Sequence, residues 1–73
     1  MELRWETHKF WVECIEQRYT KTTPERAYLE CRDMIASGYS HGIIDMAEVK
    51  RLLEVNSMIV RSKGIEPWEV LNG

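Results

Sequence analysis

The most complete helical pattern in the sequence lies between Asp45 and Gly64. Asp45 is a preferred N-cap residue, Glu48 completes the spacing of a capping box, and Gly64 suits the left-handed position that ends many helices. Between the two ends, apolar residues recur at helical spacing and form one stripe of Val49, Leu52, Leu53, Ile59 and Val60. The pattern therefore predicts a helix over residues 46–63.

One polar residue, Asn56, interrupts this apolar stripe. In heptad numbering, Asn56 and Val49 occupy a positions, which face a neighbouring helix. In a monomer, a buried Asn must hydrogen-bond to another helix or to water. In a dimer, Asn56 can pair with its own copy and fix the register of the two helices. The sequence leaves both alternatives open, and we favour a helix-mediated homodimer with residues 46–63 at or near its axis.

Two further helices are predicted before this one. Residues 7–20 carry a broad apolar face formed by Phe10, Trp11, Cys14, Ile15 and Tyr19. Residues 24–37 carry a narrower stripe formed by Ala27, Tyr28, Cys31, Met34 and Ile35. Thr23 and Pro24 fit the N-cap and first position of the second helix, and Gly38 is predicted to end it. The short link between the two helices favours antiparallel packing.

A short fourth helix is predicted over residues 67–71, because a proline at the first position favours helix initiation. Trp68 and Leu71 are expected to fold back onto the bundle. Residues 1–6 alternate between apolar and charged side chains, so a brief strand paired with residues 39–44 is a weaker alternative to a simple lead-in. The fold class predicted is all-α, a small three-helix bundle with a short fourth C-terminal helix.

Length and composition fit one helical domain over residues 1–73. A chain of this length buries only about 60% of its unfolded surface, so self-association through helices is a common way to gain stability. Its 44% apolar and 30% charged residues are typical of a globular domain, and not of a disordered segment.

Charge and hydropathy disfavour two classes of partner. A net charge of −2 disfavours a dominant role in binding nucleic acid. No apolar run approaches the roughly 18 residues of a membrane-spanning helix, so no membrane partner is expected. The default location is cytoplasmic, where Cys14 and Cys31 are expected to be reduced thiols in the core.

Residues with metal-binding or catalytic potential are few and badly spaced. The soft metal ligands available are His8, Cys14, Cys31 and His41, and none forms the close pairs typical of zinc sites. Ser40 and His41 are adjacent, but neighbouring side chains rarely face each other and no third orienting group follows. The sequence therefore predicts no enzyme activity, no metal and no cofactor.

The remaining features favour a protein-interaction module. Apolar and aromatic residues lie beyond the main helical stripes, and aromatic residues are enriched at interfaces. The candidate partner interface comprises Trp5, Trp11, Arg18, Val55, Asn56, Met58 and Trp68. For Trp11 a core position is the favoured alternative, and for Arg18 it is a packed stem with the charged head in water or on a carboxylate. We expect a small regulator or adaptor that binds another protein, such as a phage or mobile-element inhibitor of a host protein.

The alternative function is a small nucleic-acid-binding regulator. Helix 46–63 carries basic residues toward its outer face, namely Lys50, Arg51, Arg61 and Lys63. Paired with helix 24–37, it resembles the second helix of a helix-turn-helix only loosely, because the predicted loop 38–44 is longer than the turn of that motif.

Overall fold

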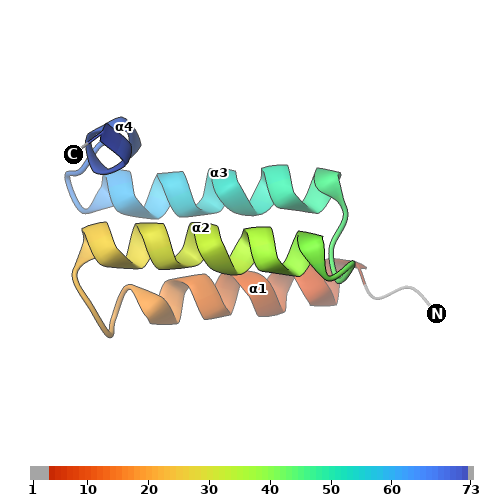
Figure 1. The fold of residues 1–73 in the computed structure, drawn as a ribbon. Coiled ribbons are helices and arrows are strands. Elements are labelled where there is room, and N and C mark those ends of the chain that lie inside the picture. The colour runs from red at the N-terminus through yellow and green to blue at the C-terminus, as the bar shows by residue number, and fades with distance from the viewer. Residues whose placement is uncertain (1–3, 73) are drawn as a thin grey trace.

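The computed structural model describes residues 4–72, and their side chains from Thr7 onward. Figure 1 shows three long helices side by side and a short fourth helix across the end of the third. The helices are α1 (Arg4–Arg18), α2 (Pro24–Ser40), α3 (Met46–Ser62) and α4 (Pro67–Asn72). No strand occurs between residues 4 and 72. The predicted all-α fold, with three packed helices and a short fourth, is confirmed.

Helix α1 starts and ends earlier than predicted. The structure is already helical at Arg4, so residues 4–6 do not form the alternative strand, and residues 1–3 lie outside the described part. At the other end, the backbone N–H of Tyr19 donates to the carbonyl of Glu16, and that of Thr20 to the carbonyl of Gln17. These bonds span three residues and tighten the chain into a turn, which removes Tyr19 and Thr20 from the helix.

Helix α2 continues through Gly38, so the prediction that Gly38 ends it is wrong. The chain instead turns at Gly42, whose φ of +74° is the left-handed conformation. The N–H of Ile43 donates to the carbonyl of Gly38 (2.9 Å), and the N–H of Gly42 to that of Tyr39 (3.0 Å). This is the paired bonding of a Schellman motif.

Gly38 has a different role, because it gives Trp11 of α1 room against α2. A Cβ atom at position 38 would lie 2.6 Å from Cη2 of Trp11 and 2.8 Å from its Cζ2. The indole therefore packs directly over the backbone of α2. A glycine inside the helix costs backbone entropy, and here the close packing of two helices offsets it.

Both predicted ends of α3 are confirmed. The side chain of Asp45 accepts a 2.9 Å hydrogen bond from the N–H of Glu48. Gly64 has a φ of +84°, and the N–H of Ile65 donates to the carbonyl of Val60 (3.2 Å), again as in a Schellman motif. The capping box is half formed, because the Glu48 carboxylate contacts His8 of α1 and Arg51 of α3 instead of returning to the backbone of Asp45.

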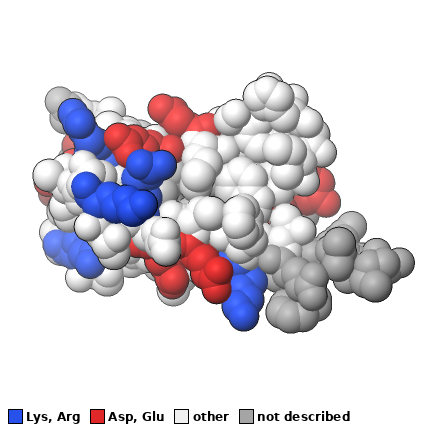
Figure 2. Space-filling model, turned by 90° about the horizontal axis from the view of Figure 1, so that it is seen from below, with Lys and Arg blue, Asp and Glu red and all other residues white. Residues whose placement is uncertain are grey.

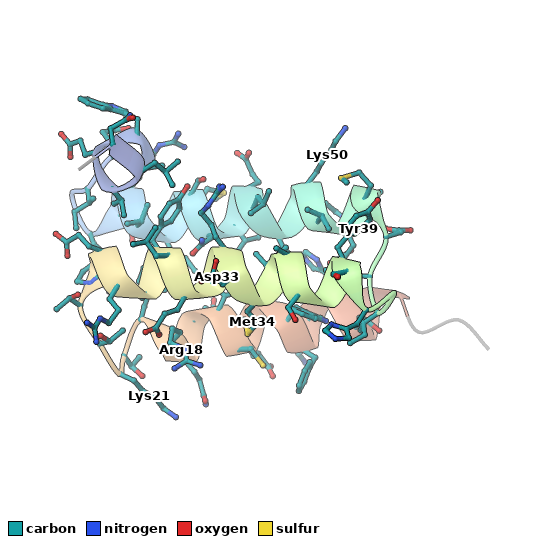
Figure 3. The ribbon with its side chains drawn as sticks, in the orientation of Figure 1. Arg18, Lys21, Asp33, Met34, Tyr39 and Lys50 are labelled. Carbon is teal, nitrogen blue, oxygen red and sulfur yellow. The ribbon has the colours of Figure 1, made fainter. Side chains whose placement is uncertain are left out.

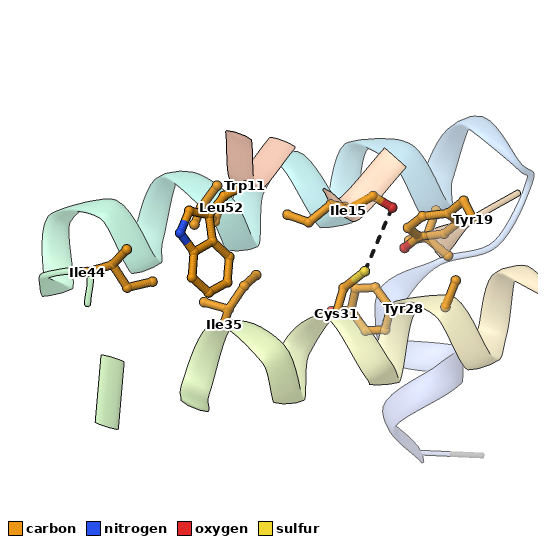
Figure 4. Packing of buried hydrophobic residues seen from close by; sticks show 10 residues of the cluster. Trp11, Ile15, Tyr19, Tyr28, Cys31, Ile35, Ile44 and Leu52 are labelled. Carbon is orange, nitrogen blue, oxygen red and sulfur yellow. Dashed lines mark hydrogen bonds between the residues drawn. The ribbon is translucent and has the colours of Figure 1, made fainter. Parts of the chain in front are cut away.

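The core lies between the three long helices. Figure 4 shows Trp11, Ile35, Ile44 and Leu52 at one end, Ile15 and Cys31 in the middle, and Tyr19 and Tyr28 at the other end. The Cys31 thiol donates to the carbonyl of Ile15 (3.9 Å), and Cys14 and Cys31 are both free thiols. The core is therefore filled by residues of the predicted apolar stripes, without a disulfide.

Helix α4 packs on the bundle through different residues from those predicted. Val70 and Ile65 lie against the core, whereas Trp68 is 61% exposed and Leu71 is also exposed. The expectation that Trp68 and Leu71 fold back is therefore wrong. No residue of this six-residue helix is fully buried.

None of the helices in residues 4–72 has the length and apolar character that crossing a bilayer requires.

Candidate interaction surface

Asn56, a predicted interface residue, lies fully inside the core. Its side-chain oxygen accepts a 2.6 Å hydrogen bond from the Tyr19 hydroxyl, and its amide nitrogen donates to the carbonyl of Tyr28 (3.1 Å). Burial, chiefly, and the neighbouring Cys31 and Tyr28 raise the pKa of Tyr19, so this hydroxyl stays protonated as the donor. Both halves of the amide are satisfied within one chain, and Asn56 is not placed to pair with a second copy.

A second, partly buried polar cluster joins α1 to α3. Glu48 is buried, and its two carboxylate oxygens contact Nδ1 of His8 (2.5 Å) and Nη2 of Arg51 (3.0 Å). An imidazole held by a carboxylate also occurs in catalytic sites, where it activates a nucleophile. Among the described residues, no Ser or Cys side chain hydrogen-bonds to His8 or Glu48. The cluster therefore has the geometry of a link between helices.

The other chemical candidates from the sequence remain separate. His41 Nδ1 lies 2.8 Å from the carbonyl of Ser37 and 3.3 Å from its hydroxyl, and not against Ser40. No group of three His, Cys, Asp or Glu side chains among the described residues is arranged to hold a metal ion. Two features of the surface are not explained by these buried contacts.

One such feature is an uncharged patch on the α1–α2 side. Arg18 of α1 pairs with Glu30 of α2 (3.5 Å), which places two helical stripes next to each other. On each helix, the residues three or four positions apart that continue from this ion pair lie on the same side. They form the patch, which we define as Phe10, Cys14, Met34, Ser37 and His41. Figure 2 shows a broad surface without charged side chains on this side of the molecule. Phe10, its largest apolar side chain, is 63% exposed.

A second feature is the face that α2 and α3 present away from α1, which we call the α2–α3 face. Its exposed apolar side chains are Tyr39 and Met46, and Val49 and Leu53 are half-buried beside them. Figure 3 shows Tyr39 reaching from the end of α2 toward the first turns of α3, with Lys50 projecting from the same end of α3. This face therefore combines apolar and basic side chains.

The predicted interface residues are spread over the molecule and do not form one site. Met58 and Trp68 are well exposed, at 59% and 61%, and Val55 is half-buried. Trp11 lies in the core, which removes it from the surface. The side chain of Trp5 lies outside the described residues.

Arg18 contacts Glu30 within the same chain, as the favoured alternative from the sequence predicted. Its guanidinium is therefore held on the α1–α2 side of the bundle. An interface with another protein is not needed to explain this side chain.

The four basic residues of the nucleic-acid alternative do not form a continuous basic face. Arg51 pairs with Glu48 (3.0 Å), and Nε of Arg61 lies 3.5 Å from Glu66. Lys63 follows the last turn of α3 as its C-cap. Sites that follow a phosphate backbone need several unpaired cations in line, and two of these four are neutralised by carboxylates.

Sequence reasoning missed the His8–Glu48 contact and the α2–α3 face. The two residues of the contact lie 40 positions apart, and no local pattern announces such a pair. Part of the face was visible in the sequence, because Val49 and Leu53 belong to the predicted stripe of residues 46–63, but its pairing with Tyr39 depended on where α2 ends. Comparison of the chain with protein-family models, curated proteins and solved structures returned no match.

Proposed function

We propose that this protein is a small non-enzymatic regulator or adaptor that acts by binding another protein. The observation that carries the proposal is the exposure of large apolar side chains at the surface of the protein. Phe10, Trp68 and Met58 are each more than half exposed. Each Å² of apolar surface removed from water contributes about 25 cal/mol, so a partner that covers these side chains gains affinity from them.

The narrower form of this function is inhibition of a host protein by a phage or mobile-element protein. Its support is the absence of a recognisable chemical motif in the sequence, together with surfaces suited to contact. An inhibitor of this kind needs only to cover a site on its target, and Trp and Phe side chains are typical anchors for that purpose.

The experiment is site-specific photo-crosslinking in cells of the native source. A photoreactive phenylalanine replaces Phe10, Tyr39 or Trp68 in turn, and Lys21 or Glu25 serves as the matched control on exposed charged positions away from these side chains. We expect a defined crosslinked species of one mass at one or more of the three apolar positions. That species should be weaker at the controls and should disappear with excess unlabelled protein.

Two results would overturn the proposal. One is equal crosslinking at apolar and control positions, which indicates random collision. The other is the absence of any crosslinked species at all three apolar positions in a protein that retains its helical circular dichroism.

A further inference from the structure

The α2–α3 face is built from two antiparallel stripes. On α2, Arg32, Ala36 and Tyr39 are spaced by four and three residues, so they share one side of the helix. On α3, Met46, Lys50 and Leu53 have the same spacing. The bond from Asn56 to the carbonyl of Tyr28 fixes how the helices are aligned, and it places Arg32 level with the middle of α3 and Tyr39 level with its start.

This face is turned away from α1. Glu48 points toward α1, where it contacts His8. Lys50 follows two residues later, and at about 100° per residue it lies on roughly the opposite side of α3. The exposed side chains here are substantial, since Tyr39 is 47% and Met46 is 45% exposed.

The two basic side chains of this face, Arg32 and Lys50, have no carboxylate partner among the described residues. Arg18, Arg51 and Arg61 each lie near a carboxylate of the same chain. Arg32 and Lys50 form no ion pair with any residue that the structure describes, and Glu54, four residues after Lys50, does not reach it. Instead, the Arg32 guanidinium lies 6.0 Å from the centre of the Tyr28 ring, which fixes its position beside the apolar side chains.

The chain already covers one end of the same two helices with a helix of its own. Helix α4 packs on α2 and α3 through Val70, and Figure 3 shows it at the end of α3 away from Tyr39 and Lys50. The part of the face near Tyr39 and Met46 has no such cover within residues 4–72.

We propose that the α2–α3 face binds an acidic amphipathic helix of the partner protein. This inference rests on the proposed function and adds the surface and the chemistry of the partner. Apolar side chains of the incoming helix, spaced by three and four residues, cover Tyr39, Met46 and Leu53. Its Asp or Glu side chains meet Arg32 and Lys50 at the sides of the contact, where charge complementarity selects an acidic helix over a basic one.

The binding test uses three fluorescently labelled synthetic peptides of equal length. The first is a helix with Leu at positions i, i+3, i+4 and i+7 and Glu on its flanks. The second is a scramble of the same composition, and the third has Lys in place of every Glu. We expect fluorescence anisotropy to show saturable binding of the first peptide, with affinities at least about tenfold lower for the other two.

Matched charge variants locate the contact. Lys50→Glu should weaken binding of the acidic peptide about tenfold and strengthen binding of the basic one. Lys21→Glu makes the same change of charge in the α1–α2 turn, at the far end of the molecule in Figure 3, and should change the affinity less than about twofold. Circular dichroism tests whether both variants fold. If Lys50→Glu does not fold, Lys50→Gln takes its place.

Amide chemical shifts decide where the peptide lies. Changes in the amide chemical shifts of Arg32, Tyr39, Met46 and Leu53 on addition of the acidic peptide support the proposal. Three results overturn it. They are equal binding of the scrambled peptide, no binding of the acidic peptide, and chemical-shift changes confined to Phe10 and its neighbours. Crosslinking at Phe10 or Trp68 with no binding of the acidic helix leaves the proposed function standing and removes only this inference.

Discussion

The Tyr19 hydroxyl donates a 2.6 Å hydrogen bond to the side-chain oxygen of Asn56, and this bond closes a polar link between three helices. Tyr19 follows α1, Asn56 belongs to α3, and the amide of Asn56 donates in turn to the carbonyl of Tyr28 on α2. No buried side-chain nitrogen or oxygen in the described residues lacks a partner. A fully satisfied network of this kind favours one alignment of the helices over others, because any shift would leave buried polar groups unpaired.

Asn56→Leu is expected to lower the free energy of unfolding by about 1–3 kcal/mol. The substitution removes the acceptor for the buried Tyr19 hydroxyl and places an apolar side chain against it. Urea unfolding followed by circular dichroism measures the change, and Ser57→Ala is the control, expected to stay within about 0.5 kcal/mol. A gain in stability together with a new sedimentation coefficient would instead support the homodimer predicted from the heptad pattern.

Gly38→Ala is expected to destabilise the protein by about 1–3 kcal/mol, because the added methyl group meets the ring of Trp11. Combining it with Trp11→Phe should recover part of that loss, since the smaller ring makes room. Gly42→Ala provides the contrast. It meets no neighbouring atom and costs about 1–2 kcal/mol through its positive φ alone, so Trp11→Phe should not rescue it.

A double-mutant cycle tests the link between His8 and Glu48. We expect the two substitutions His8→Ala and Glu48→Gln to be coupled by about 0.5–3 kcal/mol in urea unfolding, because the side chains contact each other at a partly buried position. The same His8→Ala change combined with Glu54→Gln, on the exposed side of α3, should be additive within about 0.5 kcal/mol. Equal coupling in both cycles would contradict a specific contact.

Alkaline pH is expected to destabilise the fold partly through Cys31. Burial is the main cause that raises the pKa of this thiol from 9.0 to about 11. Above about pH 9 the unfolded chain loses this proton while the folded chain keeps it, so the free energy of unfolding falls as pH rises from about 9 to about 11. Cys31→Ala should make this fall less steep. Cys14→Ala, which leaves Cys31 in place, should retain it.

Local signals in the sequence were enough to predict the four helices and the ends of α3. Asp45 and Gly64 act on the backbone within a few residues of themselves, and the structure has both in their predicted roles. Gly38 and Gly42 show the limit of that reasoning. Each can end a helix on local grounds, but only Gly42 has the left-handed conformation, and Gly38 serves a contact with Trp11 on another helix.

The candidate interaction surface was less accessible to prediction. Met58 and Trp68 lie off the apolar stripes, and both are exposed. Asn56 was assigned to an interface because an a position faces a neighbouring helix. That holds both in a dimer and in a single-chain bundle. Only the positions of Tyr19 and Tyr28 distinguish the two cases, and those positions follow from the packing of all three helices.

The packing of Trp11 on Gly38 also has an evolutionary consequence. A larger residue at position 38 destabilises the fold while the indole is present, and a smaller residue at position 11 leaves a void over the glycine. In related chains, we therefore expect these two positions to change together, even though they stand 27 residues apart on different helices. A side chain at position 38 without a smaller residue at position 11 would mark a relative whose first two helices are spaced further apart.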